Sequence, residues 1–236
     1  MIDLHTHGPT LARFVRDLEA QAPRAFDLST IDCTHADPDD VHAAWTGWAS
    51  RIVDEYRSVV VFTELLTHLA VIAAPFEMLC AVQRLIGDEL RHVQLCAQVA
   101  SVFAPLEGLE IDLEGLSLPP SEEPPGLRAL AIIGRELVVA EGESIAILRA
   151  YRDATSDVGC RAALTTMLQD EARHYATGRA LYAQLVPHVD AEFGRALETL
   201  MQADAVAIRA AHRRGAMGGP GRRFGVSIQL EEAPPG

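Results

Sequence analysis

The feature that most constrains this chain is a five-residue pattern, Asp-Glu-x-Arg-His, that occurs twice. The two copies are Asp88-Glu89-Leu90-Arg91-His92 and Asp170-Glu171-Ala172-Arg173-His174. Residues three apart on a helix project from the same face, so each copy directs one carboxylate and one imidazole to one side. Chance placement would give two such copies on the order of once in a thousand chains of this composition. The pattern therefore predicts that both copies serve one chemical purpose.

Hydrophobic residues recur at helical intervals around both copies, and proline and glycine mark where this pattern ends. We predict five helices, over residues 38–72, 76–103, 127–152, 158–186 and 190–213. Asp37-Pro38 is typical of a helix start, with an N-cap followed by proline at the first helical position. Pro75 and Pro187 separate successive helices because proline cannot continue the backbone hydrogen bonding.

The connections between these helices predict the fold. A short break joins the first two helices and another joins the third and fourth, whereas residues 104–126 contain five prolines and are too long for a tight turn. Two antiparallel hairpins joined by one long crossover are typical of an all-α four-helix bundle. We expect a single bundle domain over 37–213 with an extra C-terminal helix. It is flanked by an N-terminal extension, 1–36, with a short helix at 9–22, and by a flexible tail, 214–236.

The glutamate and histidine of each copy lie within apolar stripes. The stripe in the second helix comprises Met78, Val82, Leu85, Glu89, His92, Cys96, Val99 and Phe103. The stripe in the fourth helix comprises Leu164, Met167, Glu171, His174, Leu181 and Leu185. A buried carboxylate without a partner is costly, so these groups need ion-pair partners or a metal.

A metal site in such a bundle needs one further glutamate from the first helix of each hairpin. In the first hairpin, Glu55 lies in an apolar stripe and is as far from the hairpin turn as Glu89. The alternative, Glu64, lies on a more polar face beside His68, where the two predict a solvated pair. We therefore expect Glu55 to be the ligand.

In the second hairpin, Glu141 has the matching register with Glu171 across the predicted turn. Glu136 lies about 140° away from it on an ideal helix. A π-bulge, a distortion frequent at functional sites, would bring Glu136 closer and make it an additional ligand. We expect Glu143 to be solvated.

The resulting set, Glu55, Glu89, His92, Glu141, Glu171 and His174, resembles the di-iron carboxylate pattern of the ferritin-like superfamily. Rubrerythrins, ribonucleotide reductase small subunits, bacterial multicomponent monooxygenases and arylamine N-oxygenases share that pattern. The resemblance covers residues 50–186, and the strings 55–62 and 88–96 are similar to bacterial ferritin-like proteins of undefined substrate.

The resemblance also implies roles for the residues around the ligands. Asp88 is expected to hold His174 and Asp170 to hold His92, each from the opposing helix. This agrees with the need of a ligating imidazole for a hydrogen-bond acceptor. Arg91 and Arg173 would neutralise nearby carboxylates or form ordinary surface ion pairs.

Four carboxylates and two imidazoles suit two metal ions, Fe/Fe or Mn/Fe, better than a thiolate-seeking metal. We expect an oxidoreductase of the di-iron oxidase or oxygenase class that acts on dioxygen or peroxide, with a small organic substrate and an external electron donor. The alternatives are a ferroxidase or peroxide scavenger, and a non-catalytic helical interaction module with a structural metal. In that module the crossover and the apolar segment 224–228 would dock a partner.

A formal charge of −13 makes nucleic acid and anionic membranes poor partners. No apolar run approaches the roughly 18 residues of a membrane span, and the N-terminus lacks the pattern of a signal peptide. The four cysteines form no C-x-x-C pair and are expected to be reduced. We expect a cytoplasmic protein that forms a homodimer, the latter by analogy with other bundles.

Overall fold

The computed structural model describes residues 27–106, 114–214 and 220–226. Within these ranges all regular secondary structure is helical and no strand occurs. The all-α expectation is thus confirmed. The short helix predicted at 9–22 lies outside the described residues.

The first hairpin consists of α2 (Pro38–Val71) and α3 (Phe76–Phe103). Asp37 caps α2 by accepting a hydrogen bond from Asp39 N at 2.8 Å. Ala73 has a φ of 52°, so the chain leaves α2 through a left-handed residue before Pro75, the N-cap of α3. Both helices agree with the sequence-based bounds within one residue because these caps and breaks are local signals.

The second hairpin begins with a continuous rod of three consecutive segments. These are α4 (Pro125–Ile132), the π-helix η3 (Ile133–Ala140) and α5 (Glu141–Ala154). The next helix, α6 (Val158–Leu185), is capped by Asp157, which accepts from Cys160 N at 2.9 Å. The rod is two residues longer at each end than the predicted helix 127–152. A 3-10 turn, η4 (Val186–His188), follows α6 at Pro187.

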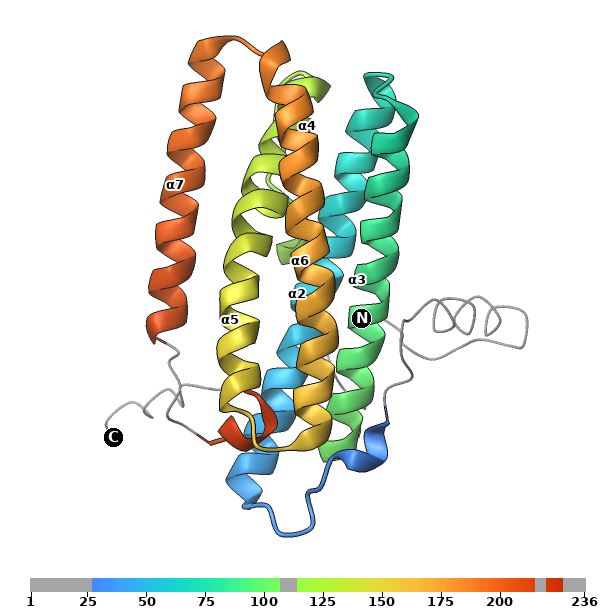
Figure 1. The fold of residues 1–236 in the computed structure, drawn as a ribbon, viewed down its shortest axis with the longest axis vertical. Helices are drawn as coiled ribbons and strands as arrows, with labels where there is room; N and C mark the ends of the chain where they lie inside the picture. Colours follow the sequence, from blue (N-terminus) through green and yellow to red (C-terminus); the bar gives the residue numbers. More distant parts are fainter. Residues whose placement is uncertain (1–26, 107–113, 215–219, 227–236) are drawn as a thin grey trace, which may run out of the picture.

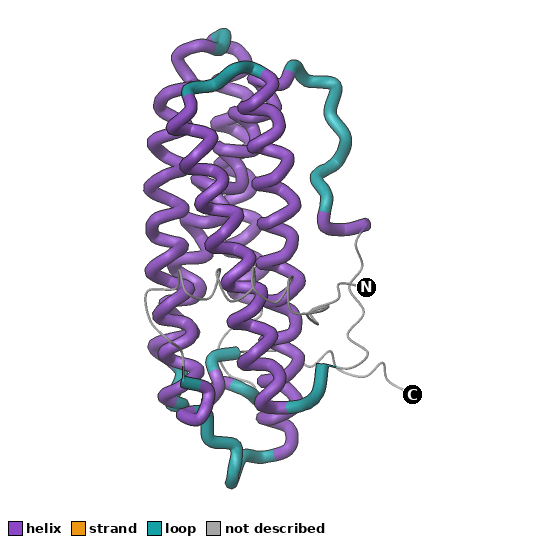
Figure 2. Tube along the Cα trace, turned by 90° about the vertical axis from the view of Figure 1, so that its right-hand side faces the viewer, coloured by secondary structure: helices purple, strands orange, loops and turns teal. Residues whose placement is uncertain are grey.

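The two hairpins lie side by side along one axis (Figure 1). The connection between them includes the 3-10 turn η2 (Glu114–Leu116), and the part that follows it runs alongside the helices (Figure 2). Leu116 in this connection is buried. The arrangement is compatible with a four-helix bundle that carries additional elements.

The last long helix, α7 (Ala191–Arg214), lies beside η3 and α5 on the outside of the second hairpin (Figure 1). Two ion pairs hold it there. Arg135 of η3 contacts Asp204 at 2.6 Å, and Arg209 contacts Glu143 of α5 at 2.6 Å. The additional C-terminal helix expected at 190–213 is therefore present.

Buried apolar side chains form two clusters along the bundle axis. One contains Trp48, Ile52, Cys96 and Leu164, and the other contains Phe62, Leu69, Leu85 and Leu137, among others. Glu89 and His92 lie between Leu85 of one cluster and Cys96 of the other along α3. The polar residues of the two repeated patterns therefore occupy a layer between two apolar ones.

The C-terminal segment 220–226 packs on the bundle. Its 3-10 turn, η5 (Arg222–Phe224), places the Phe224 ring 4.9 Å from that of Phe103, edge to face, and Phe224 is fully buried. Trp48 Nε1 donates to the Phe224 carbonyl at 3.0 Å. The expectation of a flexible tail is wrong for these residues. Because Phe224 and Val226 are buried in their own chain, they are not free to dock a partner as the segment 224–228 was expected to.

We expect Phe224→Ala to lower the free energy of unfolding by about 3–5 kcal/mol, because it leaves a cavity beside Phe103 and Trp48. Denaturant unfolding of the full chain measures this loss. Phe76→Ala is the matched control, since Phe76 is 77% exposed and its removal opens no cavity. Equal losses in the two variants would show that the tail contributes no packing.

Candidate metal centre

Four helical segments supply six ionisable side chains to one layer of the bundle. Glu55 comes from α2, Glu89 and His92 from α3, Glu141 from α5, and Glu171 and His174 from α6. Five of these side chains are buried, and Glu55 is 12% exposed. The structure therefore brings together all six residues that the sequence nominated.

Their potential ligand atoms form two overlapping groups. In each group, four atoms lie within 4.8 Å of one another. One group combines Glu89 and Glu171 with Glu55 and His92, and the other combines the same two glutamates with Glu141 and His174. Glu89 and Glu171 are thus common to both groups, while each group has a glutamate and a histidine of its own. These buried clusters can hold a metal ion.

The His92 ring turns its two nitrogens to different partners. Nδ1 lies 3.1 Å from Glu55 Oε2, 3.4 Å from Glu171 Oε1 and 3.6 Å from Glu89 Oε2. Nε2 lies 3.2 Å from Asp170 Oδ2, on the opposing helix. When Nε2–H donates to Asp170, the lone pair of Nδ1 points toward the carboxylates, which is the tautomer that a metal requires.

His174 repeats this arrangement. Its Nδ1 lies 3.0 Å from Glu89 Oε1 and 3.3 Å from Glu171 Oε2, and its Nε2 lies 3.3 Å from Asp88 Oδ2. The two imidazole rings are 5.9 Å apart. The expected exchange between helices, in which Asp88 contacts His174 and Asp170 contacts His92, is present.

Several buried atoms of this layer lack a hydrogen-bond partner. Both carboxylate oxygens of Glu89, together with Glu171 Oε2 and His174 Nδ1, are buried without one. These ionisable groups lie close to one another, but the geometry of their contacts is not that of hydrogen bonds. Leaving such atoms unsatisfied costs about 1–3 kcal/mol each. A cation between them would satisfy all four, so the donor set fits a bound metal.

Burial and mutual contact shift the pKa of Glu55, Glu141 and His174. Burial raises the pKa of Glu55 to about 8 and that of Glu141 well above its usual value. Burial opposes charge on His174 as well, but contacts with Glu171 and Glu89 outweigh it and raise its pKa to about 9. Protons therefore balance the charge of the metal-free layer, and metal binding would displace them.

Two arginines contact the aspartates behind the histidines. Arg91 forms an ion pair with Asp88, and Arg173 contacts Asp170 at 2.5 Å and Asp88 at 3.4 Å. Both aspartates are buried. Of the two roles considered for these arginines, neutralising buried carboxylates fits the contacts better than ordinary surface pairing.

A π-helix, the distortion considered above as a condition for Glu136 to be a ligand, is present, and Glu141 N donates to the Glu136 carbonyl five residues earlier. The Glu136 carboxylate does not join either ligand group. Arg57 Nη1 and Nη2 donate to its two oxygens at 3.0 and 3.1 Å. Two other glutamates considered as ligands are also ion-paired elsewhere. Glu64 contacts Arg128, and Glu143 contacts Arg209.

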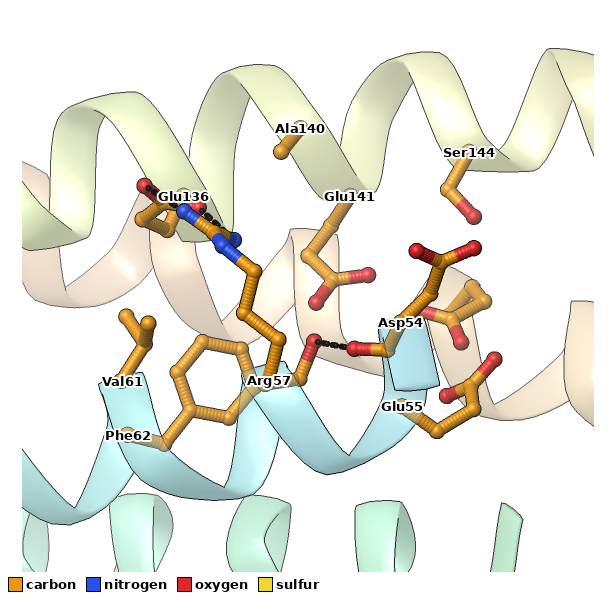
Figure 3. A pocket seen from close by; sticks show the side chains of 11 residues that line it. Asp54, Glu55, Arg57, Val61, Phe62, Glu136, Ala140, Glu141 and Ser144 are labelled. Atoms are coloured by element: carbon orange, nitrogen blue, oxygen red, sulfur yellow. Dashed lines mark hydrogen bonds and ion pairs between the residues drawn. The ribbon is translucent and has the colours of Figure 1, made fainter. Parts of the chain in front are cut away.

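A cavity of about 120 Å³ opens on the candidate ligands between α2 and the η3–α5 rod (Figure 3). It is lined by Asp54, Glu55, Arg57, Ser58, Val61, Phe62, Glu136, Ala140, Glu141, Ser144 and Glu171. Sequence reasoning missed Asp54, Arg57, Ser58 and Ser144. They lie beside the apolar stripes, where polar residues ordinarily face solvent, so their sequence carries no distinguishing signal.

We expect Asp170→Asn to weaken metal binding about 10–100-fold, because an amide at this position no longer fixes the His92 ring with a charged acceptor. Titration of the metal-free protein with manganese(II) measures the affinity. Asp153→Asn is the control, since Asp153 is 61% exposed and pairs only with Arg152 among the described contacts. Unchanged affinity in Asp170→Asn would show that Asp170 does not orient a ligand.

No protein-family model, curated protein or solved structure shows significant similarity to this chain. Among the described residues, no helix combines the length and the apolar character needed to cross a membrane. The geometry of the site is therefore what indicates a function for this chain.

Proposed function

We propose that this chain is a ferritin-like four-helix bundle that holds two metal ions and acts as an oxidoreductase on dioxygen or peroxide. One observation supports the proposal above all: two four-residue ligand groups overlap in Glu89 and Glu171. A site for one ion needs no second set of a glutamate and a histidine. Two neighbouring ions that share two carboxylates would use every member of both groups.

The donor set favours iron or manganese, as an Fe/Fe or a Mn/Fe pair. Carboxylate oxygens and imidazole nitrogens are hard or borderline ligands, and no thiol belongs to either group. Four ionised glutamates with two neutral histidines carry a charge that two divalent ions balance. Such ions supply the redox chemistry with dioxygen or peroxide that no side chain of this site can supply.

The residues of the chain would bind, orient and shield. Glu55 with His92, and Glu141 with His174, would each hold one ion from the two ends of the layer. With metal bound, Asp170 and Asp88 would each accept from Nε2–H of one imidazole and so hold both rings in the required tautomer. The apolar clusters on either side of the layer exclude water along the bundle axis, and the cavity beside Glu55 and Glu141 offers a lateral approach for a small molecule.

The second candidate is iron handling, as a ferroxidase or peroxide scavenger. The small volume of the cavity, about 120 Å³, and its many carboxylates favour small and cationic reactants over a bulky organic substrate. A structural metal in an interaction module is a weaker candidate, because Phe224 and Val226, two of the tail residues expected to dock a partner, are buried.

Oxygen consumption by the iron(II)-loaded protein tests the proposal. We expect the wild type to consume dioxygen faster than an equal concentration of free iron(II), and Glu89→Ala/Glu171→Ala to match free iron(II). Consumption that follows added iron(II) alone would favour iron handling. Turnover that needs a reductant and an organic substrate would favour an oxygenase. Metal binding without oxygen consumption would contradict both and leave a structural metal.

A further inference from the structure

The cavity reaches three of the candidate ligands. Three of its lining residues, Glu55, Glu141 and Glu171, belong to the ligand groups. Glu171 Oε2 is among the buried atoms without a hydrogen-bond partner. An ion that enters between α2 and the η3–α5 rod therefore meets the carboxylate of Glu171, one oxygen of which has no hydrogen-bond partner.

The carboxylates of the cavity become progressively more buried toward the site. Asp54 is exposed, the Glu136 side chain is 17% exposed, that of Glu55 12% and that of Glu171 4%. Clefts lined by charges of one sign concentrate ions of the opposite sign. The lining is therefore suited to conduct a cation from solvent to the ligands and unsuited to an anion.

One cation interrupts this acidic path. Arg57 of α2 reaches across the cavity to Glu136 of η3 and holds both of its oxygens. Figure 3 shows this pair beside Glu141, with Phe62 and Val61 on the same side. The π-helix hydrogen bond from Glu141 N to Glu136 O places the two glutamates one helical turn apart, and both line the cavity from the η3–α5 rod. Glu136 thus lines the same cavity as the candidate ligand Glu141 one helical turn away, but Arg57 neutralises its charge.

We propose that this cavity is the route by which divalent metal ions reach the site. Glu136 is the entry carboxylate, and Arg57 is its latch, the cation that an incoming ion must displace. The inference rests on the proposed metal-binding function and adds how the site is loaded. An incoming cation competes with Arg57 for the Glu136 carboxylate and then passes to Glu55 and Glu141. The cavity has room for a few water molecules, so a partly hydrated ion fits.

The rate of cobalt(II) uptake by the metal-free protein tests the route, followed by stopped-flow visible absorption with cobalt(II) alone. Arg57→Gln removes the latch and its positive charge, so uptake should be faster than in the wild type. Glu136→Gln removes the entry carboxylate and leaves Arg57 without its partner, so uptake should be slower by about tenfold. The final cobalt content should equal that of the wild type in both variants.

Two further variants separate the latch from general charge effects. Arg57→Lys keeps the charge but loses the two-pronged contact, so it should load faster than the wild type and more slowly than Arg57→Gln. Arg209→Gln and Glu143→Gln are matched controls, because they remove the same residue types from an ion pair that does not line the cavity. Both should load at the wild-type rate.

The outcomes distinguish this inference from the proposal on which it rests. Equal uptake rates in the wild type, Arg57→Gln and Glu136→Gln, with normal final content, would overturn the route and leave the metal site intact. A reduced final content in Glu136→Gln would make Glu136 a ligand and overturn its role as an entry group. Absence of cobalt binding in the wild type would overturn the metal site itself.

Discussion

Saturation with manganese(II) is expected to raise the free energy of unfolding by about 4 kcal/mol for each bound ion, and so by about 8 kcal/mol for two, when free metal exceeds the dissociation constant a thousandfold. The folded layer gathers six candidate ligands from four helical segments, whereas the unfolded chain separates them. Binding to the folded state alone therefore stabilises it by mass action. Denaturant unfolding with and without a chelator measures the difference.

The double variant Glu89→Ala/Glu171→Ala provides the control for this effect. Both groups lose their two common members, so manganese(II) should no longer change the stability of the variant. The metal-free variant should still fold, because it removes two buried carboxylates whose desolvation opposes folding. A wild type whose stability is the same with metal and with chelator would contradict a site of this kind.

Gly178→Ala is expected to lower the free energy of unfolding by about 3 kcal/mol, at the upper end of the cost of overpacking. A Cβ at Gly178 of α6 would lie 2.5 Å from Leu137 Cβ and 2.9 Å from the Leu137 carbonyl carbon. Leu137 belongs to the π-helix, and its backbone cannot rotate away as a side-chain tip could. The two helices would have to separate, which thermal or denaturant unfolding detects.

The matched control is Gly194→Ala in α7, where an added Cβ meets no atom within 4 Å. Alanine is the better helix former by about 1 kcal/mol, so this variant should be as stable as the wild type or more so. Gly178→Ala should also weaken manganese(II) binding, because α6 carries Glu171 and the rod carries Glu141. Similar stability of the two variants would show that the close approach at Gly178 is not required.

The sequence predicted the helices well because their signals are local. Asp37-Pro38, Pro75 and Asp157 start or separate helices through contacts within a few residues. The six candidate ligands could also be predicted from the sequence, because glutamate and histidine at helical spacing within an apolar stripe require a partner. Register about the hairpin turns then selected Glu55 over Glu64 and Glu141 over Glu143, and the structure places these selections together.

Contacts between segments that are distant in the sequence could not be predicted in this way. The Arg57–Glu136 pair joins residues 79 positions apart, and Trp48 contacts Phe224 across 176 positions. Gly and Pro in the tail indicate mobility from composition alone, but Phe224 is anchored by burial that only the folded bundle provides. Reading the sequence at helical spacing also assumes a regular helix. A π-helix near Glu136 was therefore only one alternative, and its extent could not be predicted.

The central claim is that this chain binds two metal ions through the overlapping ligand groups, and elemental analysis tests it most directly. Wild type and Glu89→Ala/Glu171→Ala would be purified from iron-replete cells, and the folding of each checked by circular dichroism. The account predicts about two iron or manganese ions per wild-type chain and almost none in the variant. Little or no metal in a folded wild type, or equal metal in both proteins, would contradict it.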